Sequence, residues 1–121
     1  MNAPRWEHFE HEADIGVRGM GATPGEAFEM AAVALSAVVA DPVRIECRDE
    51  VALEARADTL EQLLVAWLSA VIFEMASRRM LFRRFHVTLE NTNLRATAAG
   101  EPVDPARHEP AVEVKGASYA C

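Results

Sequence analysis

The sequence predicts an α+β fold in which a mainly antiparallel β-sheet carries two α-helices packed on one side. Segments that alternate apolar and polar residues arrive in consecutive pairs joined by short polar turns, which favours antiparallel pairing. Two longer segments have helical periodicity and well-marked starts. The chain has 121 residues, of which 50% are hydrophobic, enough to bury one core. We therefore expect a single domain over residues 1–121.

Two short strands are expected first, over residues 5–10 and 15–18, with a polar cluster between them. The cluster contains His11, Glu12 and Asp14, and carboxylates that lie close together attract hard divalent cations through their oxygens. Three polar residues in a turn are nevertheless more often solvated or capping groups than a binding site. A metal would also need ligands from elsewhere in the chain. Acidic residues nearer the C-terminus are candidates for that role: Glu101, Asp104 and Glu113.

The first helix has a clear start and a clear end. Thr23 is a favourable N-cap, Pro24 occupies the first helical position, and Glu26 lies three residues after the cap, as in a capping box. Apolar residues then recur every three or four positions up to about Ala40, which gives the helix one apolar stripe. The dipeptide Asp41-Pro42 is expected to end it.

Two further strands are expected over residues 43–47 and 51–55, with a polar turn at 48–50 between them. Asp58 is then predicted to cap a second helix, with Glu61 three residues later, where negative charge also suits the helix dipole. A wide apolar stripe makes this the expected central helix of the core. The stripe consists of Leu60, Leu63, Leu64, Trp67, Leu68, Val71, Ile72 and Met75.

The arginine-rich segment 78–84 has two interpretations. Four arginines around large apolar residues could contact RNA or an acidic partner, but a solvated helix end is favoured, because cations suit the C-terminal end of a helix dipole. The remaining expected elements are a strand at 85–89, a turn at 91–93, a returning strand at 94–98, a loop at 100–105 and a last strand at 111–119.

The composition and the absence of certain motifs argue against some classes of function. A formal net charge of −7 disfavours direct binding to the phosphates of nucleic acid, and it suits binding to a basic protein or to a cation. No run approaches the length of a membrane span, and the N-terminus has no secretory pattern. Cys47 and Cys121 fit no paired spacing, so a cytoplasmic location is expected. Nucleotide-binding and nucleophile motifs are absent, which makes a stand-alone enzyme less favoured.

Four segments together resemble the archease family. His11-Glu12-Ala13-Asp14-Ile15-Gly16 is similar to the family's His-Thr-Ala-Asp-hydrophobic-Gly signature, with Glu12 in place of the usual Thr. The other segments are Thr23–Phe28, Asp58–Leu64 with Trp67-Leu68 soon after, and Glu113–Tyr119. The resemblance implies a small α+β protein that assists a GTP-dependent RNA ligase of the RtcB type, which seals tRNA halves or broken RNA. Such a protein promotes guanylylation of the ligase and its multiple turnover, while the ligase does the chemistry.

The resemblance also implies roles for individual residues. Asp14 matches a ligand of a divalent cation, Ca²⁺ or Mg²⁺, and Lys115 matches a lysine implicated in activation. His11, Glu101 and Glu113 are the further candidates for activation or partner contact. The expected partner is the ligase, without stable direct binding of nucleic acid and without a membrane. A general chaperone-like protein-binding module is the alternative function, and a metal-dependent hydrolase built on Asp14 is a more distant one.

The C-terminal segment departs from the family pattern. Archeases continue past the strand that matches residues 113–119 and place an acidic ligand near their C-terminus, whereas this sequence ends at Cys121 with no Asp or Glu after Glu113. We therefore expect a domain that lacks the family's C-terminal strands and binds Ca²⁺ or Mg²⁺ weakly, because affinity depends on ligand number and charge. An edge strand that lacks its neighbouring strand can pair with another copy, so we also expect either self-association through this edge or that the chain is a shortened product.

Overall fold

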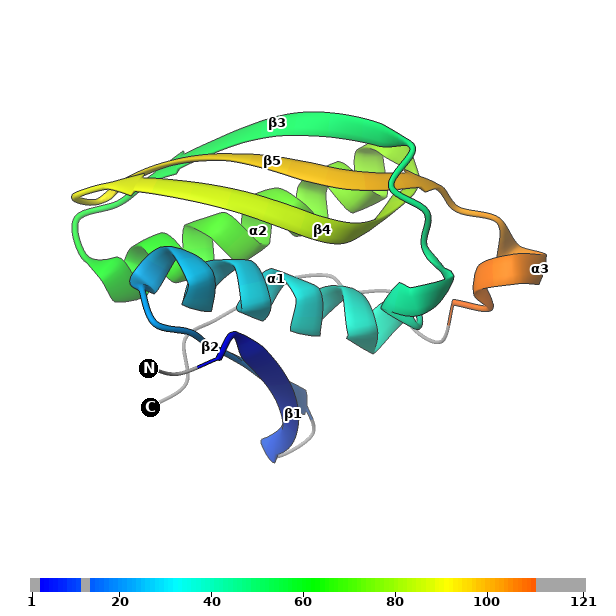
Figure 1. Ribbon diagram of the computed structural model, residues 1–121, viewed down its shortest axis with the longest axis horizontal. Helices are drawn as coiled ribbons and strands as arrows, with labels where there is room; N and C mark the ends of the chain where they lie inside the picture. Colours follow the sequence, from blue (N-terminus) through cyan, green and yellow to red (C-terminus); the bar gives the residue numbers. More distant parts are fainter. Residues whose placement is uncertain (1–2, 12–13, 111–121) are drawn as a thin grey trace.

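The fold has a three-stranded antiparallel sheet on one side of a helical layer and a two-stranded hairpin on the other (Figure 1). The computed structural model describes residues 3–11 and 14–110, and of residues 11, 14 and 15 the backbone alone. Its elements in chain order are β1 (Arg5–His11), β2 (Asp14–Met20), α1 (Pro24–Val39), the 3-10 helix η1 (Pro42–Arg44), β3 (Asp49–Arg56), α2 (Leu60–Arg78), β4 (Met80–Glu90), β5 (Asn93–Pro102) and α3 (Pro105–His108).

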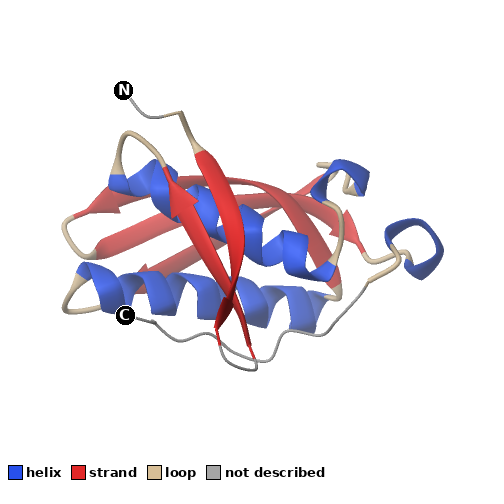
Figure 2. Ribbon diagram, turned by 90° about the horizontal axis from the view of Figure 1, so that it is seen from below, coloured by secondary structure: helices blue, strands red, loops and turns tan. Residues whose placement is uncertain are grey.

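The two long helices lie side by side beneath the three-stranded sheet, whose strand order is β3-β5-β4. The hairpin of β1 and β2 crosses α1 on the face turned away from this sheet, as the view from below shows (Figure 2). Helix α1 is therefore covered on two sides, by β4 above and by the hairpin below. The predicted α+β class, with both helices on one side of an antiparallel sheet, is confirmed.

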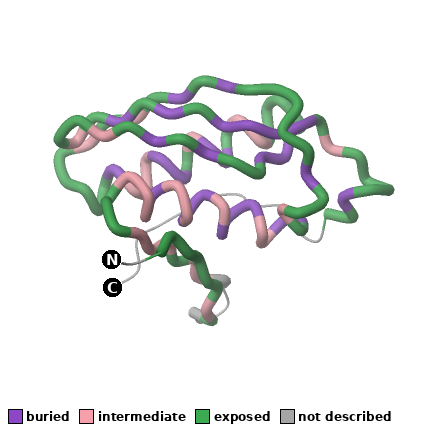
Figure 3. The backbone as a smooth tube through the Cα atoms, viewed as in Figure 1, coloured by how far each residue is buried: buried purple, intermediate pink, exposed green. Residues whose placement is uncertain are grey.

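The core fills the space between the sheet and the helices, and buried positions gather there while much of the hairpin stays exposed (Figure 3). Trp67 at the centre of α2 is fully buried and packs edge-on against Phe85 of β4. Its indole N–H donates a hydrogen bond of 3.0 Å to the carbonyl oxygen of Phe28 in α1. This one side chain thus joins both helices and the sheet, as the apolar stripe of α2 predicted.

The start of α1 also follows the prediction. The hydroxyl of Thr23 accepts a hydrogen bond of 3.1 Å from the backbone N–H of Glu26, and Pro24 is the first helical residue. Gly19 of β2 allows the hairpin to lie close to this helix, because a Cβ at that position would stand 2.1 Å from the carbonyl oxygen of Ala27 and 2.2 Å from the backbone nitrogen of Ala31. A side chain at residue 19 would push the hairpin away from α1.

The predicted strand over residues 43–47 is wrong. Asp41 caps η1 instead, and its Oδ1 accepts a hydrogen bond of 3.0 Å from the N–H of Val43. This local capping bond and the fixed φ of Pro42 favour a helical turn over an extended strand. Ile45, which alternation placed in the strand, is buried in a small apolar cluster with Val39, Ala40 and Leu81. The expected turn at 48–50 is also too long, since β3 begins at Asp49.

Helix α2 begins one residue later than predicted, because its N-cap is Thr59 and not Asp58. The Thr59 hydroxyl accepts a hydrogen bond of 3.1 Å from the N–H of Gln62. The helix has 19 residues, and an 18-residue window within it has a mean hydropathy of 1.4, so by length and composition alone it could cross a membrane, contrary to our expectation that no segment approaches this. A core helix meets the same criteria, and Leu63, Trp67 and Val71 of α2 are fully buried against the sheet and α1.

The arginine-rich segment is mostly a strand and not a helix end. Helix α2 stops at Arg78, Arg79 takes a left-handed conformation with φ 52°, and β4 starts at Met80. Met80, Leu81 and Phe82 are buried, and their burial stabilises the strand over a longer helix. In the C-terminal half, β5 extends to Pro102, and α3 occupies part of the predicted loop over 100–105. The strand predicted at 111–119 lies outside the described residues.

Candidate functional site

The hairpin places the polar cluster of the sequence at its tip. The Cα of His11 pairs with that of Asp14 where β1 ends and β2 begins, so the two residues lie on opposite strands of the hairpin end. The structure therefore brings these two predicted site residues together. The side chains of both, together with Glu12, Glu113 and Lys115, lie outside the described part of the chain. What the structure establishes here is the position of the backbone that carries the cluster.

Side-chain contacts fix the stem of this hairpin against α1. The Nε2 of His8 lies 2.7 Å from the carbonyl oxygen of Ala34, so the imidazole donates from that nitrogen and ties β1 to the helix. On the neighbouring strand, the guanidinium of Arg18 lies 4.7 Å from the centroid of the Phe9 ring and forms an ion pair with Glu7. The tip is thus carried by a stem that is joined to the helical layer.

Glu101, the predicted ligand or partner contact in the C-terminal half, is fully buried. Its carboxylate accepts a bidentate pair of hydrogen bonds from Arg107, one of them 2.8 Å long. It also accepts from the backbone N–H of Glu46 at 2.6 Å and from Nε2 of His108 at 3.0 Å. We call the group of Glu46, Glu101, Arg107 and His108 the Glu101 junction. Its bonds hold α3 against the segment that leads into β3.

The hydrogen bonds also define the tautomer of His108. The backbone N–H of Asp104 donates to Nδ1 of this imidazole over 2.8 Å, so the ring proton sits on Nε2 and is donated to Glu101. The same Asp104 caps α3, since its Oδ1 accepts from the N–H of Ala106 at 3.1 Å. Both acidic candidates of this region, Glu101 and Asp104, are therefore engaged in local bonds.

The electrostatics of the Glu101 junction favour the ionised carboxylate. The hydrogen bonds from Arg107 hold the pKa of Glu101 well below its usual range, with smaller contributions from the Glu46 backbone and His108, while burial acts in the opposite direction. The same pair raises the pKa of Arg107 above its ordinary value. A carboxylate that already accepts four hydrogen bonds has little capacity left for a cation or for a partner's side chain.

The hairpin tip and the Glu101 junction do not form one site. Both ribbon views place the tip of β1 and β2 well away from α3 (Figures 1 and 2). Among the side chains that the structure describes, which do not include those of residues 11–15, no group of three or more His, Cys, Asp or Glu is arranged to hold a metal ion. His11 and Asp14 can supply at most part of a coordination shell, because Ca²⁺ and Mg²⁺ take six or more ligands.

The partners of Glu101 were not predicted from the sequence. Arg107 and His108 reach it only because β5 runs on to Pro102 and Asp104 then starts a four-residue helix. The succession of Asp104 and Pro105 is an N-cap followed by a proline at the first helical position. That signal was available in the sequence, but the direction in which α3 presents its side chains was not.

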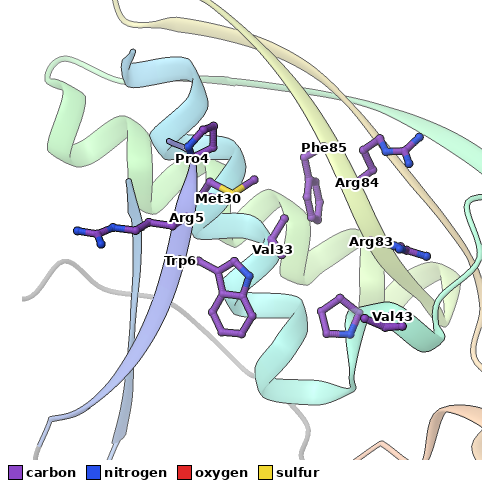
Figure 4. Close-up of a pocket in the computed structure, with 10 residues that line it drawn as sticks. Pro4, Arg5, Trp6, Met30, Val33, Val43, Arg83, Arg84 and Phe85 are labelled. Atoms are coloured by element: carbon purple, nitrogen blue, oxygen red, sulfur yellow. The ribbon is translucent and has the colours of Figure 1, made fainter. Parts of the chain in front are cut away.

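A groove between β1, α1, η1 and β4 was also not predicted (Figure 4). It has a volume of about 550 Å³ and combines apolar side chains with three arginines. We call it the arginine-rimmed groove, and its lining consists of Pro4, Arg5, Trp6, Met30, Val33, Pro42, Val43, Arg83, Arg84 and Phe85. Two of these arginines belong to the segment whose binding role the sequence left open.

Comparisons with known proteins extend over most of the chain. The Archease protein family (MTH1598/TM1083) matches residues 6–121. Protein archease of Pyrococcus abyssi is 40% identical over 119 residues, which cover 95% of this chain and 84% of that protein. Protein archease of Sulfurisphaera tokodaii is 38% identical over 117 residues, with the same two coverages of 95% and 84%. The solution structure of Methanobacterium thermoautotrophicum protein 1598 matches with a TM-score of 0.72 and 27% identity, over 85% of this chain and 76% of that one.

Proposed function

The chain belongs to the archease family, and on that premise we propose that it is an accessory factor that activates a GTP-dependent RNA ligase of the RtcB type. It would promote guanylylation and repeated turnover of the ligase in tRNA splicing or RNA repair, in the cytoplasm. The observation that carries the proposal is a similarity to archeases that spans 95% of the chain, with a family match over residues 6–121 that includes the hairpin tip. In this role the chain does no bond chemistry of its own.

The shape and charge of the molecule support an accessory role. A narrow hairpin joined to α1 is suited to presenting its tip to a partner (Figure 2). An RNA ligase must hold phosphates with Lys and Arg, so its RNA-binding surface is basic. A chain with a net charge of −7 would be attracted to such a surface and would itself be repelled by free RNA.

We assign Asp14 as the first ligand of a divalent cation, Ca²⁺ or Mg²⁺, with His11 beside it at the hairpin tip. The remaining ligands would come from residues outside the described part, such as Glu113. A bound cation would supply positive charge for phosphate oxygens, and Lys115 would add a point charge of the same sign. In this proposal Glu101 is a structural residue and not a partner contact, because its carboxylate is buried and its hydrogen bonds position α3.

The test measures guanylylation of an RtcB-type ligase and multiple-turnover sealing of RNA, with and without this chain. The wild-type chain should raise both. Asp14→Ala should abolish the stimulation and keep the wild-type circular dichroism spectrum and melting temperature. Asp58→Ala, which removes an exposed carboxylate far from the hairpin tip in the sequence, is the matched control and should stimulate normally. Full stimulation by folded Asp14→Ala would refute the assignment of this residue.

The same assay separates the two function classes. A wild-type chain that leaves guanylylation and turnover unchanged, yet suppresses aggregation of unrelated unfolded proteins, would favour the chaperone-like alternative. Calorimetric titration with Ca²⁺ adds a readout that does not depend on the ligase. Heat of binding that disappears in Asp14→Ala would support the cation ligand, and equal binding by both proteins would contradict it.

A further inference from the structure

The inside of the arginine-rimmed groove is apolar. Met30 and Val33 of α1 lie between Trp6 of β1 on one side and Phe85 of β4 on the other (Figure 4). Trp6 is 38% exposed, and Val43 of η1 at the end of the groove is 74% exposed. Large apolar side chains that gather in an exposed hollow mark a surface that gains free energy when a partner covers it.

The charge of the groove is opposite to that of the protein. The chain carries a net charge of −7, but the lining contains no Asp or Glu and includes Arg5, Arg83 and Arg84. Among the described residues, six other arginines lie within 4.0 Å of a carboxylate, and none of these three does. Figure 4 shows Arg83 and Arg84 along β4 on one side, with Arg5 extending from β1 on the other. The Arg5 side chain extends away from the groove and its Nε donates to Met20 Sδ over 3.3 Å, so the arginines without a carboxylate partner that border the groove lie on the β4 side.

One wall of the groove belongs to the edge strand of the three-stranded sheet. β4 is at the edge of the sheet order β3-β5-β4. The N–H of Val87 donates to the Glu29 carboxylate over 2.7 Å, so it points away from β5. Alternate residues of a strand direct their backbone groups to the same side, so the backbone groups of Phe85 are directed to the side where α1 packs, and the residue as a whole is only 5% exposed. A register shift between Phe82 and Arg84 bends the strand at this place.

We propose that the arginine-rimmed groove binds an extended segment of a partner protein in which acidic residues alternate with large apolar ones. The segment would lie in the groove, beside α1 and the edge strand β4. Its apolar side chains would cover Trp6, Met30 and Val33. Its carboxylates would pair with Arg83 and Arg84. Alternate side chains of an extended segment point to opposite sides, so one set can meet the apolar floor while the other meets the arginines.

The observations favour a peptide over RNA as the occupant. The floor of the groove is apolar and can be covered by apolar side chains of a peptide. An Arg–carboxylate pair at the rim adds electrostatic attraction and fixes the orientation of the two groups through paired hydrogen bonds. Single-stranded RNA would need a longer run of positive charge along its backbone, and the acidic remainder of the chain would repel it. This inference stands apart from the proposed function, because it concerns a different surface and any partner with such a segment.

The test begins with a displayed library of random twelve-residue peptides selected on the full chain. Selected peptides should be enriched in Asp or Glu alternating with Phe, Trp, Leu, Ile or Val. A synthetic peptide of the consensus is then titrated against the chain by fluorescence anisotropy. Arg83→Glu/Arg84→Glu should weaken its binding by roughly tenfold or more, as expected for lost charge-assisted hydrogen bonds. Arg56→Glu is the matched control, since Arg56 is exposed on β3 at the opposite edge of the sheet, and it should bind as the wild type does.

Three results would overturn the proposal. The library could yield no acidic and apolar consensus, or the double variant could bind the consensus peptide as tightly as Arg56→Glu does. A twelve-nucleotide single-stranded RNA could also bind more tightly than the peptide and lose affinity in the double variant, which would make the groove a phosphate site. Thermal melts establish that the variants are folded, and Arg84→Glu alone replaces the double variant if that protein does not fold. The result of the ligase assay with Asp14→Ala does not affect this test, because the described residues that line the arginine-rimmed groove do not include Asp14.

Discussion

The apolar core and the Glu101 junction hold the molecule together in different ways. In the core, Trp67, Leu63 and Val71 of α2 are fully buried among apolar side chains of α1 and the sheet. In the junction, the buried Glu101 is held by four hydrogen bonds from Arg107, His108 and the backbone of Glu46. Apolar burial has no preferred direction, whereas each bond of the junction needs a particular atom in place.

This difference determines how each region responds to change. When a core side chain is shortened, the free energy of unfolding falls roughly in proportion to the volume removed, and neighbouring side chains relax only in part. A buried ion pair has little net stabilising effect while it is intact, because desolvation offsets the attraction, but removal of one partner leaves the other buried and uncompensated. Substitutions in the core should therefore lower the free energy of unfolding in proportion to the size of the group removed. In the junction, the loss of a single hydrogen-bonding atom should already lower it.

The largest effect is expected in the core. Trp67→Ala removes the side chain that joins α1, α2 and β4, together with its hydrogen bond to Phe28. The free energy of unfolding should fall by roughly 3–5 kcal/mol, enough to unfold much of a small domain. Urea denaturation followed by circular dichroism measures this. Phe73→Ala on the same helix is the control, because Phe73 is 66% exposed and its loss should change stability by at most about 0.5 kcal/mol. A Trp67→Ala protein that melts like the wild type would contradict the core assignment.

The junction should give the next largest effect. Glu101→Ala leaves Arg107, His108 and the Glu46 backbone without their acceptor, and the free energy of unfolding should fall by about 3 kcal/mol. Glu101→Gln keeps the volume and one acceptor oxygen, so its loss should be smaller. Urea denaturation of both variants, beside Glu54→Ala at an exposed position of β3, tests the order. Equal stability of Glu101→Ala and Glu54→Ala would show that the junction contributes nothing.

The junction should also make stability depend on pH in the acid range. The bonds from Arg107 lower the folded-state pKa of Glu101 below its unfolded value, which is about 4.3. The unfolded chain therefore takes up a proton before the folded chain does, and the stabilisation is present above the unfolded pKa and lost as pH falls through the folded pKa. Melting temperatures between pH 6 and pH 2 should fall more steeply for the wild type than for Glu101→Gln. Parallel curves would exclude Glu101 as a source of the acid sensitivity.

The smallest effect is expected at a polar group inside the core layer. The hydroxyl of Ser36 in α1 is fully buried and has no hydrogen-bond partner among the described residues. Ser36→Ala removes that unsatisfied group and improves helix propensity, so the free energy of unfolding should rise by about 0.5–1 kcal/mol. The increase should appear as a higher urea midpoint with an unchanged slope. A lower midpoint would indicate that the hydroxyl has a partner after all.

Several elements were predictable from the sequence because their signals are local. Thr23 caps α1 as expected, and the apolar stripe of α2 places Trp67 in the core, since capping and helical periodicity depend on residues only a few positions apart. The strands around Val51 and Val87 also follow from alternation. The polar cluster at the hairpin tip was visible for the same reason, although its role in a metal site stays a prediction.

Other features depend on which segments meet in space. Alternation over residues 43–47 suggested a strand, but the Asp41 cap stabilises η1, and only the packed structure shows Ile45 buried beside Leu81. The sequence alone determined two helices with apolar stripes, the cap of α1, most of the alternating strands and the polar tip, because short-range hydrogen bonds and periodicity specify them. The tertiary structure alone decided that Glu101 meets Arg107, and that distant arginines and aromatic side chains share one groove, because such contacts depend on how the elements pack.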